Sequence, residues 1–493
     1  MERISAAQFR DESSPMSANV ASHPFHAAPR IEALGAVEVE SLLAAIGPGQ
    51  PSFLLESGLD VAGTGRWHIA GVDPIGSFEA SRDRWQVRTG DGVIDSGRGD
   101  PLEQLDRWWK QWATKDPAEV DSLPFVGGAV GWIGYEAADR FVGLSPRQTP
   151  TGAIGSLLDG VPDLCWQLYD EVVLIDAIEQ QGWSVHRGRA GWQDRRWWRR
   201  SGSTSSDPSD SISSSPVRIV ESSLTDAQYL DAVTEIRHGI GLGEVYEVNL
   251  ARGWIVDPVP SPVALHRLWR EAQPVPYGAM IQGDPFSVVS ASPEQFLSRR
   301  GRRIGTRPIK GTIARGRDGA EDRQAATALL ADPKERAELA MIVDLERNDL
   351  GRICQPGTVE VVHPAQVERY ASVLHTVATV TGELRGDPSP GEILRATFPG
   401  GSITGAPKLA AMERIRQLEP WPRSIYTGSI GWLAPTGDLE LSIAIRSALL
   451  RGKRALIPFG GAVTWDSKPQ AERAELLDKA RAMFEALGIT VAH

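Results

Sequence analysis

The stretch GAMIQGDPFSVVSASPEQFL at residues 278–297, which continues into GRRIGTRPIKGTIA at 301–314, sets the fold class. Its apolar runs are separated by glycine turns, a pattern typical of successive β-strands. A segment with helical character follows at 332–352. Runs of strands thus mix with runs of helices instead of alternating as regular βαβ units. This order predicts an α+β protein built in layers.

The same pattern extends outward from this stretch in both directions. On the N-terminal side, glycine-bounded runs predict an antiparallel sheet with strands at 51–58, 65–74, 84–94, 125–138 and 171–179, and a helix at 101–113. On the C-terminal side, strands are predicted at 359–363, 377–384, 424–433, 439–450 and 454–464, followed by a last helix.

A serine-rich segment divides the chain. Residues 201–216, SGSTSSDPSDSISSSP, contain one apolar side chain, Ile212. They bury too little surface to offset the entropy lost on ordering, which predicts a linker. Residues 1–30 are polar and rich in Pro and Ser and are predicted to form a mobile extension. The segments 31–200 and 217–493 then form a β-rich N-terminal subdomain and a larger C-terminal domain.

Composition restricts the function classes. The chain has 493 residues and a formal net charge of −11, which argues against a nucleic-acid-binding surface. Its two cysteines, Cys165 and Cys354, offer no disulfide framework, which fits a reducing cytoplasm. No apolar run approaches the length of a membrane-spanning helix. We therefore expect a cytoplasmic globular protein.

Two pairs of glutamates suggest a metal site. Glu335 and Glu338, and Glu472 and Glu475, are each three residues apart and follow a proline at a predicted helix start. Residues three apart share one helix face, so each segment presents two carboxylates to one place. If the two faces meet, Mg²⁺ would relieve the repulsion between the four groups. The alternative is that both pairs lie on solvated helix faces.

Five motifs occur in a fixed order between residues 308 and 467: PIKGT, VDLERNDLGR, GGSITGAPK, IYTGSIGW and GGAV-x-x-DS. Together they resemble the chorismate-utilising enzymes, strongly over 217–493. Over 30–200 the resemblance is weaker and rests on LLES at 54–57 and GGAVGWIGYE at 127–136. It implies an α/β/β/α sandwich, with two antiparallel sheets packed face to face and helices outside. It also implies that 217–493 is the chorismate-binding catalytic domain.

Lys310 in PIKGT distinguishes two branches of that family. Members that make anthranilate carry alanine there, and those that make 4-amino-4-deoxychorismate often carry lysine. The resemblance implies that Lys310 adds to C2 of chorismate and displaces the C4 hydroxyl, and that ammonia then attacks C4 and expels the lysine. This chemistry requires a neutral amine and hence a lowered pKa. The alternative is a counter-ion to a substrate carboxylate or to Glu294.

Two further residues receive catalytic roles from the resemblance. Glu294, in SASPEQFL, would protonate the departing hydroxyl, a role that demands a raised pKa. The alternative is a salt bridge with Arg299 or Arg300. His375, in ASVLHTVATVTG, would orient the hydroxyl or the substrate, whereas a lone histidine in an apolar strand is more often a satisfied core residue.

Chorismate is a dianion, and its ring carboxylate is expected on the metal. Arg446, on a predicted strand, suits the enolpyruvyl carboxylate because arginine binds carboxylates through two parallel hydrogen bonds. The alternative is an ion pair with Glu440 or Asp438. The remaining candidates for substrate binding are Tyr426, Gly311, Thr312, Gly460, Gly461, Ser402 and Lys408.

Position 247 departs from the family pattern. In YEVNLAR it is glutamate, whereas amine-adding relatives usually show glutamine and water-adding relatives lysine. Glu247 argues against water addition, but it also places an acid where it would hold Lys310 cationic. LLESG at 54–58 resembles the tryptophan pocket of relatives, although a core strand ending at a turn explains it equally well.

The resemblance thus predicts Mg²⁺-dependent amination of chorismate at C4 with retention of pyruvate. The partners it implies are a glutamine amidotransferase subunit that supplies ammonia and a downstream lyase that forms 4-aminobenzoate for folate. One alternative is the branch that makes anthranilate plus pyruvate for tryptophan. Another is a chorismate-binding homologue without turnover, against which the four glutamates argue.

Overall fold

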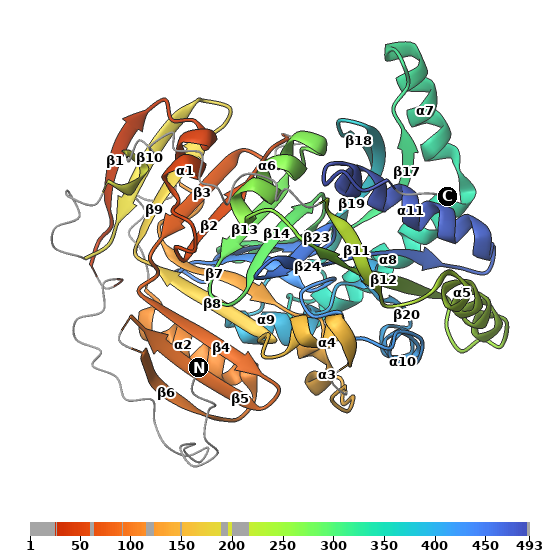
Figure 1. Ribbon diagram of the computed structural model, residues 1–493, viewed down its shortest axis with the longest axis horizontal. Helices are drawn as coiled ribbons and strands as arrows, with labels where there is room; N and C mark the ends of the chain where they lie inside the picture. Colours follow the sequence, from red (N-terminus) through yellow and green to blue (C-terminus); the bar gives the residue numbers. More distant parts are fainter. Residues whose placement is uncertain are drawn as a thin grey trace.

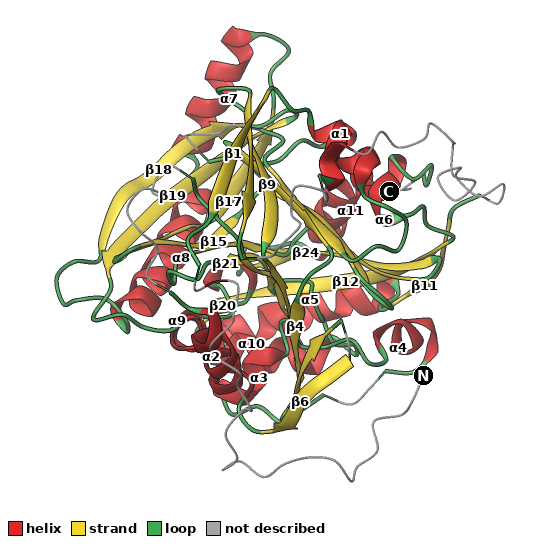
Figure 2. Cartoon of the chain, turned by 90° about the vertical axis from the view of Figure 1, so that its left-hand side faces the viewer, coloured by secondary structure: helices red, strands yellow, loops and turns green. Residues whose placement is uncertain are grey.

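The computed structural model describes residue 25 and residues 27–59, 64–90, 92–114, 123–147, 150–188, 196–199 and 216–490. Within them the chain forms two antiparallel sheets of twelve strands each (Figure 1). Helices flank the strands on both sides (Figure 2).

The first sheet contains, in spatial order, β1 (Arg30–Gly35), β10 (Gln181–His186), β9 (Glu171–Asp176), β3 (Trp67–Val72), β2 (Ser52–Glu56), β13 (Tyr277–Gln282), β14 (Ser287–Ser292), β23 (Ser447–Arg451), β24 (Arg454–Val463), β12 (Glu247–Asp257) and β11 (Arg218–Ser222), with β20 (Gly405–Ala406) paired to β12. The second contains β17 (Ile309–Ala314), β19 (Val373–Glu383), β16 (Arg303–Arg307), β15 (Gln295–Arg300), β22 (Leu439–Ile443), β21 (Ser429–Leu433), β7 (Gly128–Ile133), β8 (Leu164–Tyr169), β4 (Gly76–Ser81), β5 (Arg84–Thr89) and β6 (Gly92–Arg98), with β18 (Glu360–Arg369) paired to β19.

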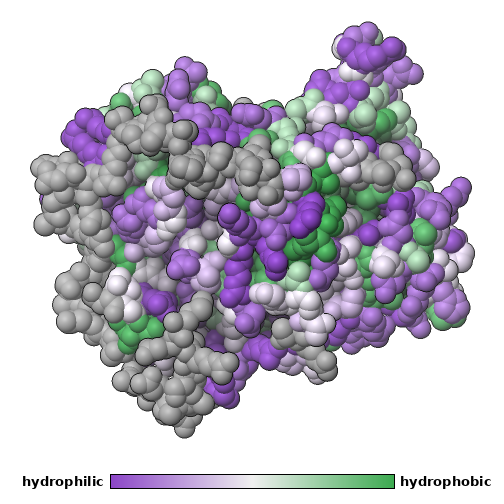
Figure 3. Space-filling view, in the orientation of Figure 1, coloured by the Kyte–Doolittle hydropathy of each residue, from purple (hydrophilic) through white to green (hydrophobic). Residues whose placement is uncertain are grey.

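The helices of the described residues are α1 (Val39–Ala45), α2 (Pro101–Trp112), α3 (Ala137–Phe141), α4 (Gly152–Leu158), α5 (Asp226–Gly241), α6 (Pro262–Ala272), α7 (Gly319–Ala331), α8 (Pro333–Gly351), α9 (Pro390–Thr397), α10 (Lys408–Leu418) and α11 (Pro469–Glu485), with short 3₁₀ turns η5 (Trp197–Arg199) and η6 (Gly401–Ile403). Helix α7 projects from the body, and its outer end is covered by hydrophilic side chains (Figures 1 and 3).

The core is built from the alternation of side chains along the strands. Phe53 and Leu54 are neighbours on β2 and point to opposite faces of the first sheet. Phe53 packs in the layer between the sheets with Trp132 and Ile430 of the second sheet. Leu54 belongs to the layer under helices α1, α5, α6 and α11. A third layer joins the outer face of the second sheet to α2, α8 and α9. The predicted α/β/β/α sandwich is confirmed.

Both sheets combine strands from either side of the predicted linker. Strand β2 pairs with β13 in the first sheet, and β7 pairs with β21 in the second. The two segments on either side of 201–216 therefore share their sheets. Residues 201–215 and most of the predicted extension 1–30 lie outside the described residues. Within that extension, Phe25 is buried against Trp112, with ring centroids 5.7 Å apart.

The helices that carry the glutamate pairs begin where the sequence predicts. Helix α8 starts at Pro333, and the carboxylate of Asp332 accepts hydrogen bonds from the backbone N–H groups of Lys334 and Glu335. Helix α11 starts at Pro469 without such a side-chain cap.

Two simpler expectations also concern the described residues. Cys165 and Cys354 are both free and buried. No helix within the described ranges is long and apolar enough to cross a membrane.

Candidate active site

The candidate site lies where the two sheets approach each other near Lys310. Lys310, on β17 of the second sheet, is buried, and its ammonium donates to Glu247 Oε1 at 2.6 Å. Glu247 is the first residue of β12 in the first sheet and is fully buried. This ion pair therefore joins an element of each sheet.

Lys310 does not have the lowered pKa that the sequence analysis expected. Burial by itself lowers the pKa of the ammonium, but the charge and hydrogen bond of Glu247 oppose it, helped by the charges of Glu338 and Glu294. The net result is a raised pKa, so the lysine is cationic in this state. The structure thus places Glu247 where the sequence analysis expected an acid that would hold Lys310 cationic, and the neutral amine that the covalent step requires stays a prediction.

Glu294 lies in the setting that the sequence analysis required. It sits between β14 and β15, and burial raises its pKa to about 7 despite hydrogen bonds from the Ser402 side chain and the Ile309 N–H. The suggested partners are engaged elsewhere, since Arg299 pairs with Asp387 and Arg300 with Glu440. A salt bridge of Glu294 with Arg299 or Arg300 is thereby excluded, and with a pKa of about 7 Glu294 is protonated in a substantial fraction of molecules at neutral pH.

His375 is a neutral, fixed imidazole. It lies on β19, and its Nδ1 is 2.8 Å from Thr312 Oγ1. The ring of Tyr370 packs edge-on at a centroid distance of 4.8 Å. Burial lowers the pKa of His375 to about 3, assisted by the charge of Arg446. The imidazole can therefore orient a ligand, but it carries no charge at neutral pH.

Arg446 is not on a strand, contrary to the prediction. It lies between β22 and β23, which belong to different sheets, and its φ is +52°. The sequence of 439–450 does not reveal the end of β22, because the strands on both sides of Arg446 are rich in apolar residues. Neither suggested partner holds it, since Glu440 pairs with Arg300 and Asp438 accepts from the Gly301 N–H. Burial lowers the pKa of Arg446 only to about 10, which leaves it cationic at neutral pH.

Four buried polar atoms of this region have no hydrogen-bond partner among the described residues. They are Glu247 Oε2, His375 Nε2, Thr376 Oγ1 and Arg446 Nη1. Buried polar atoms in proteins are nearly always paired. One of the four belongs to the cationic guanidinium of Arg446, so the region is suited to a polar ligand that carries an anionic group.

Glycines bring main chain close to the acidic side chains. Gly311 has a φ of +85°, and a Cβ there would lie 3.1 Å from Glu335 Oε2. Gly460 and Gly461 pair with Ala251 and Leu250 of β12. A Cβ on Gly460 would lie 2.9 Å from the Tyr426 hydroxyl, and one on Gly461 would lie 3.8 Å from Glu472 Oε2. Gly311 and Gly461 therefore lie beside the carboxylates and Gly460 beside the Tyr426 hydroxyl, and substrate binding by these four residues stays a prediction.

Of the two predicted residues in the GGSITGAPK segment, Ser402 contacts the site and Lys408 does not. Ser402, in η6, is buried and binds Glu294. Lys408, the first residue of α10, binds Asp349 Oδ2 at 2.5 Å and the Thr397 carbonyl at 3.2 Å. It is thus tied to α8, and within the described ranges neither of these hydrogen bonds reaches another candidate residue.

The four glutamates face one another across α8 and α11, with lysines between them. Burial raises the pKa of Glu338 to about 7 and also raises those of Glu335 and Glu472. Lys479 lies 2.8 Å from Glu475 and lowers the pKa of that carboxyl, and Lys334 lies 3.7 Å from Glu338. The charges of Glu475 and Glu335 act on each other, and Lys334 is within electrostatic reach of all four glutamates.

This donor set fits Mg²⁺ by residue type, because carboxylate oxygens are its usual protein ligands. In the part of the chain that the structure describes, no three acidic, histidine or cysteine side chains converge closely enough to hold a metal ion. Lys334 and Lys479 instead pair with Glu338 and Glu475. Metal binding by these four glutamates therefore stays a prediction.

The sequence analysis missed Asn249. Its side-chain N–H donates to Glu247 Oε1 at 3.3 Å and to the Ser402 carbonyl at 3.1 Å. It therefore links the partner of Lys310 to the segment that binds Glu294. Its place two residues after Glu247 on one strand, hence on the same face, was a usable signal.

A second hollow lies near the predicted tryptophan pocket. Leu55, Glu56 and Ser57 line a cavity of about 990 Å³, together with Tyr277 and Trp432. Glu56 itself is buried and paired with His266 at 2.7 Å and Arg270 at 2.6 Å. Leu54–Glu56 also belong to core strand β2, so both interpretations of LLESG are compatible with the structure, and tryptophan binding stays a prediction.

Comparison with known proteins supports the resemblance. The family described as chorismate binding enzyme matches residues 59–485. Aminodeoxychorismate synthase component 1 of Bacillus subtilis (strain 168) is 34% identical over 446 residues, covering 88% of this chain and 91% of that protein. Anthranilate synthase component 1 of Acinetobacter calcoaceticus is 31% identical over 457 residues, covering 89% and 90%.

Solved structures agree with the fold. Anthranilate synthase component I from Streptococcus pneumoniae TIGR4 matches with a TM-score of 0.69 at 28% identity, over 85% of this chain and 92% of that chain. The menaquinone-specific isochorismate synthase from Escherichia coli matches with a TM-score of 0.68 at 18% identity, over 93% and 95%. The second likeness concerns the fold alone.

Proposed function

The chain belongs to the chorismate-binding enzyme family, and on that premise we propose that it aminates chorismate at C4 to 4-amino-4-deoxychorismate, the reaction of an aminodeoxychorismate synthase component 1. The observation that carries this proposal is the buried Lys310–Glu247 pair in the neighbourhood of a protonated Glu294. An amine and an acid are the two groups that displacement of a ring hydroxyl by a lysine requires.

In the proposed reaction Arg446 binds the enolpyruvyl carboxylate. Its unpartnered Nη1 and its burial suit an anion in a site of low dielectric. His375 keeps its Nε2 free to orient the substrate. The pyruvyl ether is not cleaved and stays on the ring.

Lys310 must lose a proton before it attacks, and Glu247 Oε1 is its nearest acceptor at 2.6 Å. The amine then forms a bond to C2, both conjugated double bonds of the ring shift by one position (from C1=C2 and C5=C6 to C1=C6 and C4=C5), and the C4–O bond breaks. Glu294 transfers its proton to the departing oxygen, which leaves as water. Ammonia next attacks C4, both double bonds shift back, the C2–N bond breaks, and the extra proton of the added ammonia passes to the Lys310 nitrogen, which leaves as the amine.

Glu335, Glu338, Glu472 and Glu475 are the residues that would hold Mg²⁺. When bound, the ion supplies positive charge for the ring carboxylate and for the acidic helix faces. The raised pKa values of Glu335, Glu338 and Glu472, which burial causes, support the proposal because added positive charge would favour the ionised form of these carboxyls.

The proposal includes partners. We infer that ammonia comes from a separate glutamine amidotransferase subunit, and that a lyase converts the product to 4-aminobenzoate for folate. The component 1 naming of the relatives supports a two-component enzyme. The reaction would take place in the cytoplasm.

Product identification tests the proposal. The protein is incubated with chorismate, Mg²⁺ and ammonium, and the products are separated by mass spectrometry, with pyruvate measured in parallel. Aminodeoxychorismate without pyruvate is the expected result. Anthranilate with equimolar pyruvate would assign the other branch, and chorismate binding without any product would indicate a homologue without turnover.

A second candidate, anthranilate synthase component 1, is favoured by relatives that are 31% and 33% identical over about nine-tenths of the chain. That reaction adds ammonia at C2, where the proposed reaction places Lys310. A cationic Lys310 paired to Glu247 would then act only as a binding group. The pyruvate measurement separates the two.

A further inference from the structure

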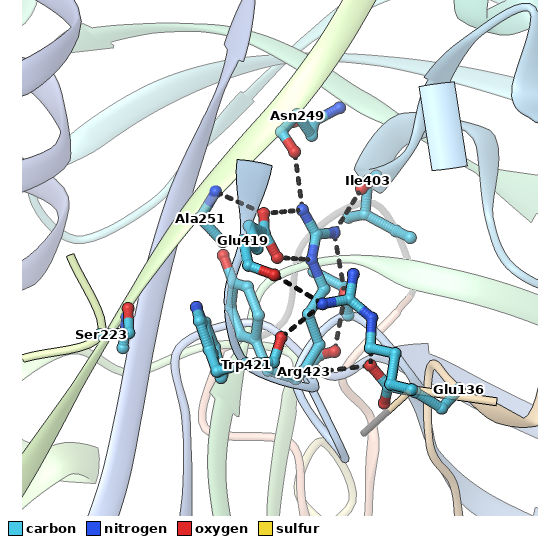
Figure 4. Close-up of polar contacts among 12 residues, drawn as sticks. Glu136, Ser223, Asn249, Ala251, Ile403, Glu419, Trp421 and Arg423 are labelled. Carbon is cyan, nitrogen blue, oxygen red and sulfur yellow. Dashed lines mark hydrogen bonds and ion pairs between the residues drawn. The ribbon is translucent and has the colours of Figure 1, made fainter. Parts of the chain in front are cut away.

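A fully buried ion pair lies behind the candidate site. Arg423 and Glu419 have side chains that are 0% exposed, and two hydrogen bonds join them, of 2.6 Å from Nη2 to Oε1 and 2.8 Å from Nε to Oε2 (Figure 4). Glu419 ends helix α10, and Arg423 lies in the following loop. Both belong to LEPWPRSIY, a run that the sequence analysis did not use.

The rest of the guanidinium binds three other segments (Figure 4). Arg423 Nη2 donates to the Asn249 carbonyl at 2.6 Å, and Nη1 donates to the Ile403 carbonyl at 3.1 Å and to Thr427 Oγ1 at 3.2 Å. Glu419 Oε1 accepts from the Ala251 N–H at 2.8 Å. One ion pair thereby holds β12, η6 and the loop before β21.

Each of these segments carries a group of the candidate site. Ile403 follows Ser402, which binds Glu294. Thr427 follows Tyr426. Asn249 stands two residues after Glu247 and donates to both Glu247 Oε1 and the Ser402 carbonyl. The contacts therefore run from Arg423 through Asn249 to both halves of the proposed chemistry, Lys310–Glu247 and Glu294.

The pair is also anchored from the N-terminal side. Arg147 Nη1 donates to the carbonyls of Glu419 at 2.8 Å and Trp421 at 2.7 Å. Glu136, the last residue of GGAVGWIGYE, accepts from the backbone N–H groups of Arg423 and Ser424 at 2.7 and 2.8 Å (Figure 4). The loop that presents Arg423 is thus fixed on both of its faces.

Stability alone does not explain a buried ion pair. Replacing such a pair with apolar residues of similar size is often neutral or stabilising, because desolvation of two charges offsets their attraction. An apolar pair makes no directional hydrogen bonds, whereas the planar guanidinium of Arg423 binds two carbonyls and one hydroxyl at defined positions. The burial is therefore better explained by geometry than by stability.

We propose that Arg423, Glu419 and Asn249 are positioning residues that set the placement of Lys310–Glu247 relative to Glu294. The proposal rests on the proposed function in so far as it takes these groups to perform the chemistry. None of the three touches the reacting atoms in this account. They act through Glu247 and Ser402.

The test compares three variants. Arg423→Lys keeps the charge beside Glu419, but one ammonium cannot serve Glu419, Asn249, Ile403 and Thr427 together. Asn249→Ala removes the link at a half-buried position, so it keeps the test open if Arg423→Lys fails to fold. Arg187→Lys is the matched control, since Arg187 is 1% exposed and donates to the Val126 carbonyl on the N-terminal side.

Two measurements separate positioning from stability. In chorismate amination, Arg423→Lys and Asn249→Ala should lower kcat roughly 10- to 100-fold, as small misplacements do, with KM for chorismate nearly unchanged. In protein labelled with ¹⁵N at lysine Nζ, the Lys310 signal, identified by its loss in Lys310→Arg, should titrate at lower pH in both variants because Glu247 is held less firmly. Arg187→Lys should lower only the melting temperature.

The outcomes are distinguishable. Unchanged kcat and an unchanged Lys310 titration in Arg423→Lys and Asn249→Ala would overturn the inference, whatever happens to the melting temperature. If the wild-type protein forms no aminodeoxychorismate, the proposed function fails. The Lys310 titration requires no turnover, so it still decides whether the pair positions Glu247.

Discussion

Two parts of the candidate site hold their charges in different ways. Lys310, Glu294 and Arg446 are carried by strands or by the segments between strands, where Lys310 pairs with Glu247 and Glu294 accepts from the Ile309 N–H. The acids of α8 and α11 lie on helices, and two of them pair with a lysine of their own helix, Glu338 with Lys334 and Glu475 with Lys479. The first part is thus held by contacts between strands, and the second by pairs within single helices.

The difference indicates which part supplies chemistry and which supplies binding charge. A group that transfers a proton must be placed within a fraction of an ångström in advance. Carboxylates that bind a hydrated divalent cation can close around it, because the ion itself replaces the lysine charges. The predictions below test this division, beginning with the largest expected effect.

Lys310→Ala should abolish amination while chorismate still binds through Arg446. It also leaves the buried Glu247 without a cationic partner, which should cost about 3–5 kcal/mol in the free energy of unfolding. The matched control is Lys310→Met with Glu247→Leu, which removes both charges and should fold more stably than the single variant yet remain inactive. Retained amination in Lys310→Ala would remove the covalent step.

Glu294→Gln should lower kcat by about 10²- to 10⁴-fold, the usual contribution of a general acid. Gln cannot donate the proton that turns the C4 hydroxyl into water, but it keeps the size of the side chain. Chorismate binding measured by calorimetry should change little. A loss confined to KM would make Glu294 a binding residue instead.

Glu338→Gln or Glu475→Gln should raise the Mg²⁺ concentration that gives half-maximal activity by at least roughly 10- to 100-fold. Loss of a residue that only supports a metal ligand already has an effect of about this size, and loss of a ligand should cost no less. At saturating Mg²⁺ kcat should recover in large part, because these groups hold charge and do not transfer protons. Glu346→Gln, a buried acid of the same helix, is the control. An unaltered Mg²⁺ titration would exclude both glutamates as ligands.

The pH dependence gives the smallest effect. Glu294 acts in its protonated form, so the rate of the covalent step should be level below about pH 7 and should fall as pH rises through the pKa of about 7. The hydrogen bond from Ser402 lowers that pKa, and Ser402→Ala should therefore move the decline to higher pH. Single-turnover rates without ammonia avoid the titration of ammonium itself. If the rate of Ser402→Ala declined at the same pH as that of the wild type, the hydrogen bond from Ser402 to Glu294 would be contradicted.

The layered fold followed from local patterns in the sequence, because strand alternation and helix starts are local properties. Pro333 and Pro469 begin helices as predicted, and the runs around 51–58 and 125–138 form strands. The pairing of β2 with β13 could not be predicted from local patterns, since residues as far apart in the chain as Leu55 and Ala279 meet only through tertiary packing. The same holds for the sharing of both sheets across the linker.

In the site, residue types and their charges were largely predictable, whereas the contact that sets the charge of Lys310 was not. The raised pKa of Glu294 was expected from its role, and the structure provides the burial that causes it. The raised pKa of Lys310 depends on Glu247, sixty-three positions away along the chain. The break at Arg446 was missed because apolar strands flank it on both sides.

The most direct test of the central claim is to look for the covalent intermediate itself. The wild-type protein is mixed with chorismate and Mg²⁺ without ammonia, quenched, and examined by intact-protein and peptide mass spectrometry. The account predicts an adduct equal to chorismate less one water on the peptide that contains Lys310, discharged by added ammonia and absent from Lys310→Ala. Steady formation of aminodeoxychorismate with no such adduct at any quench time would contradict it.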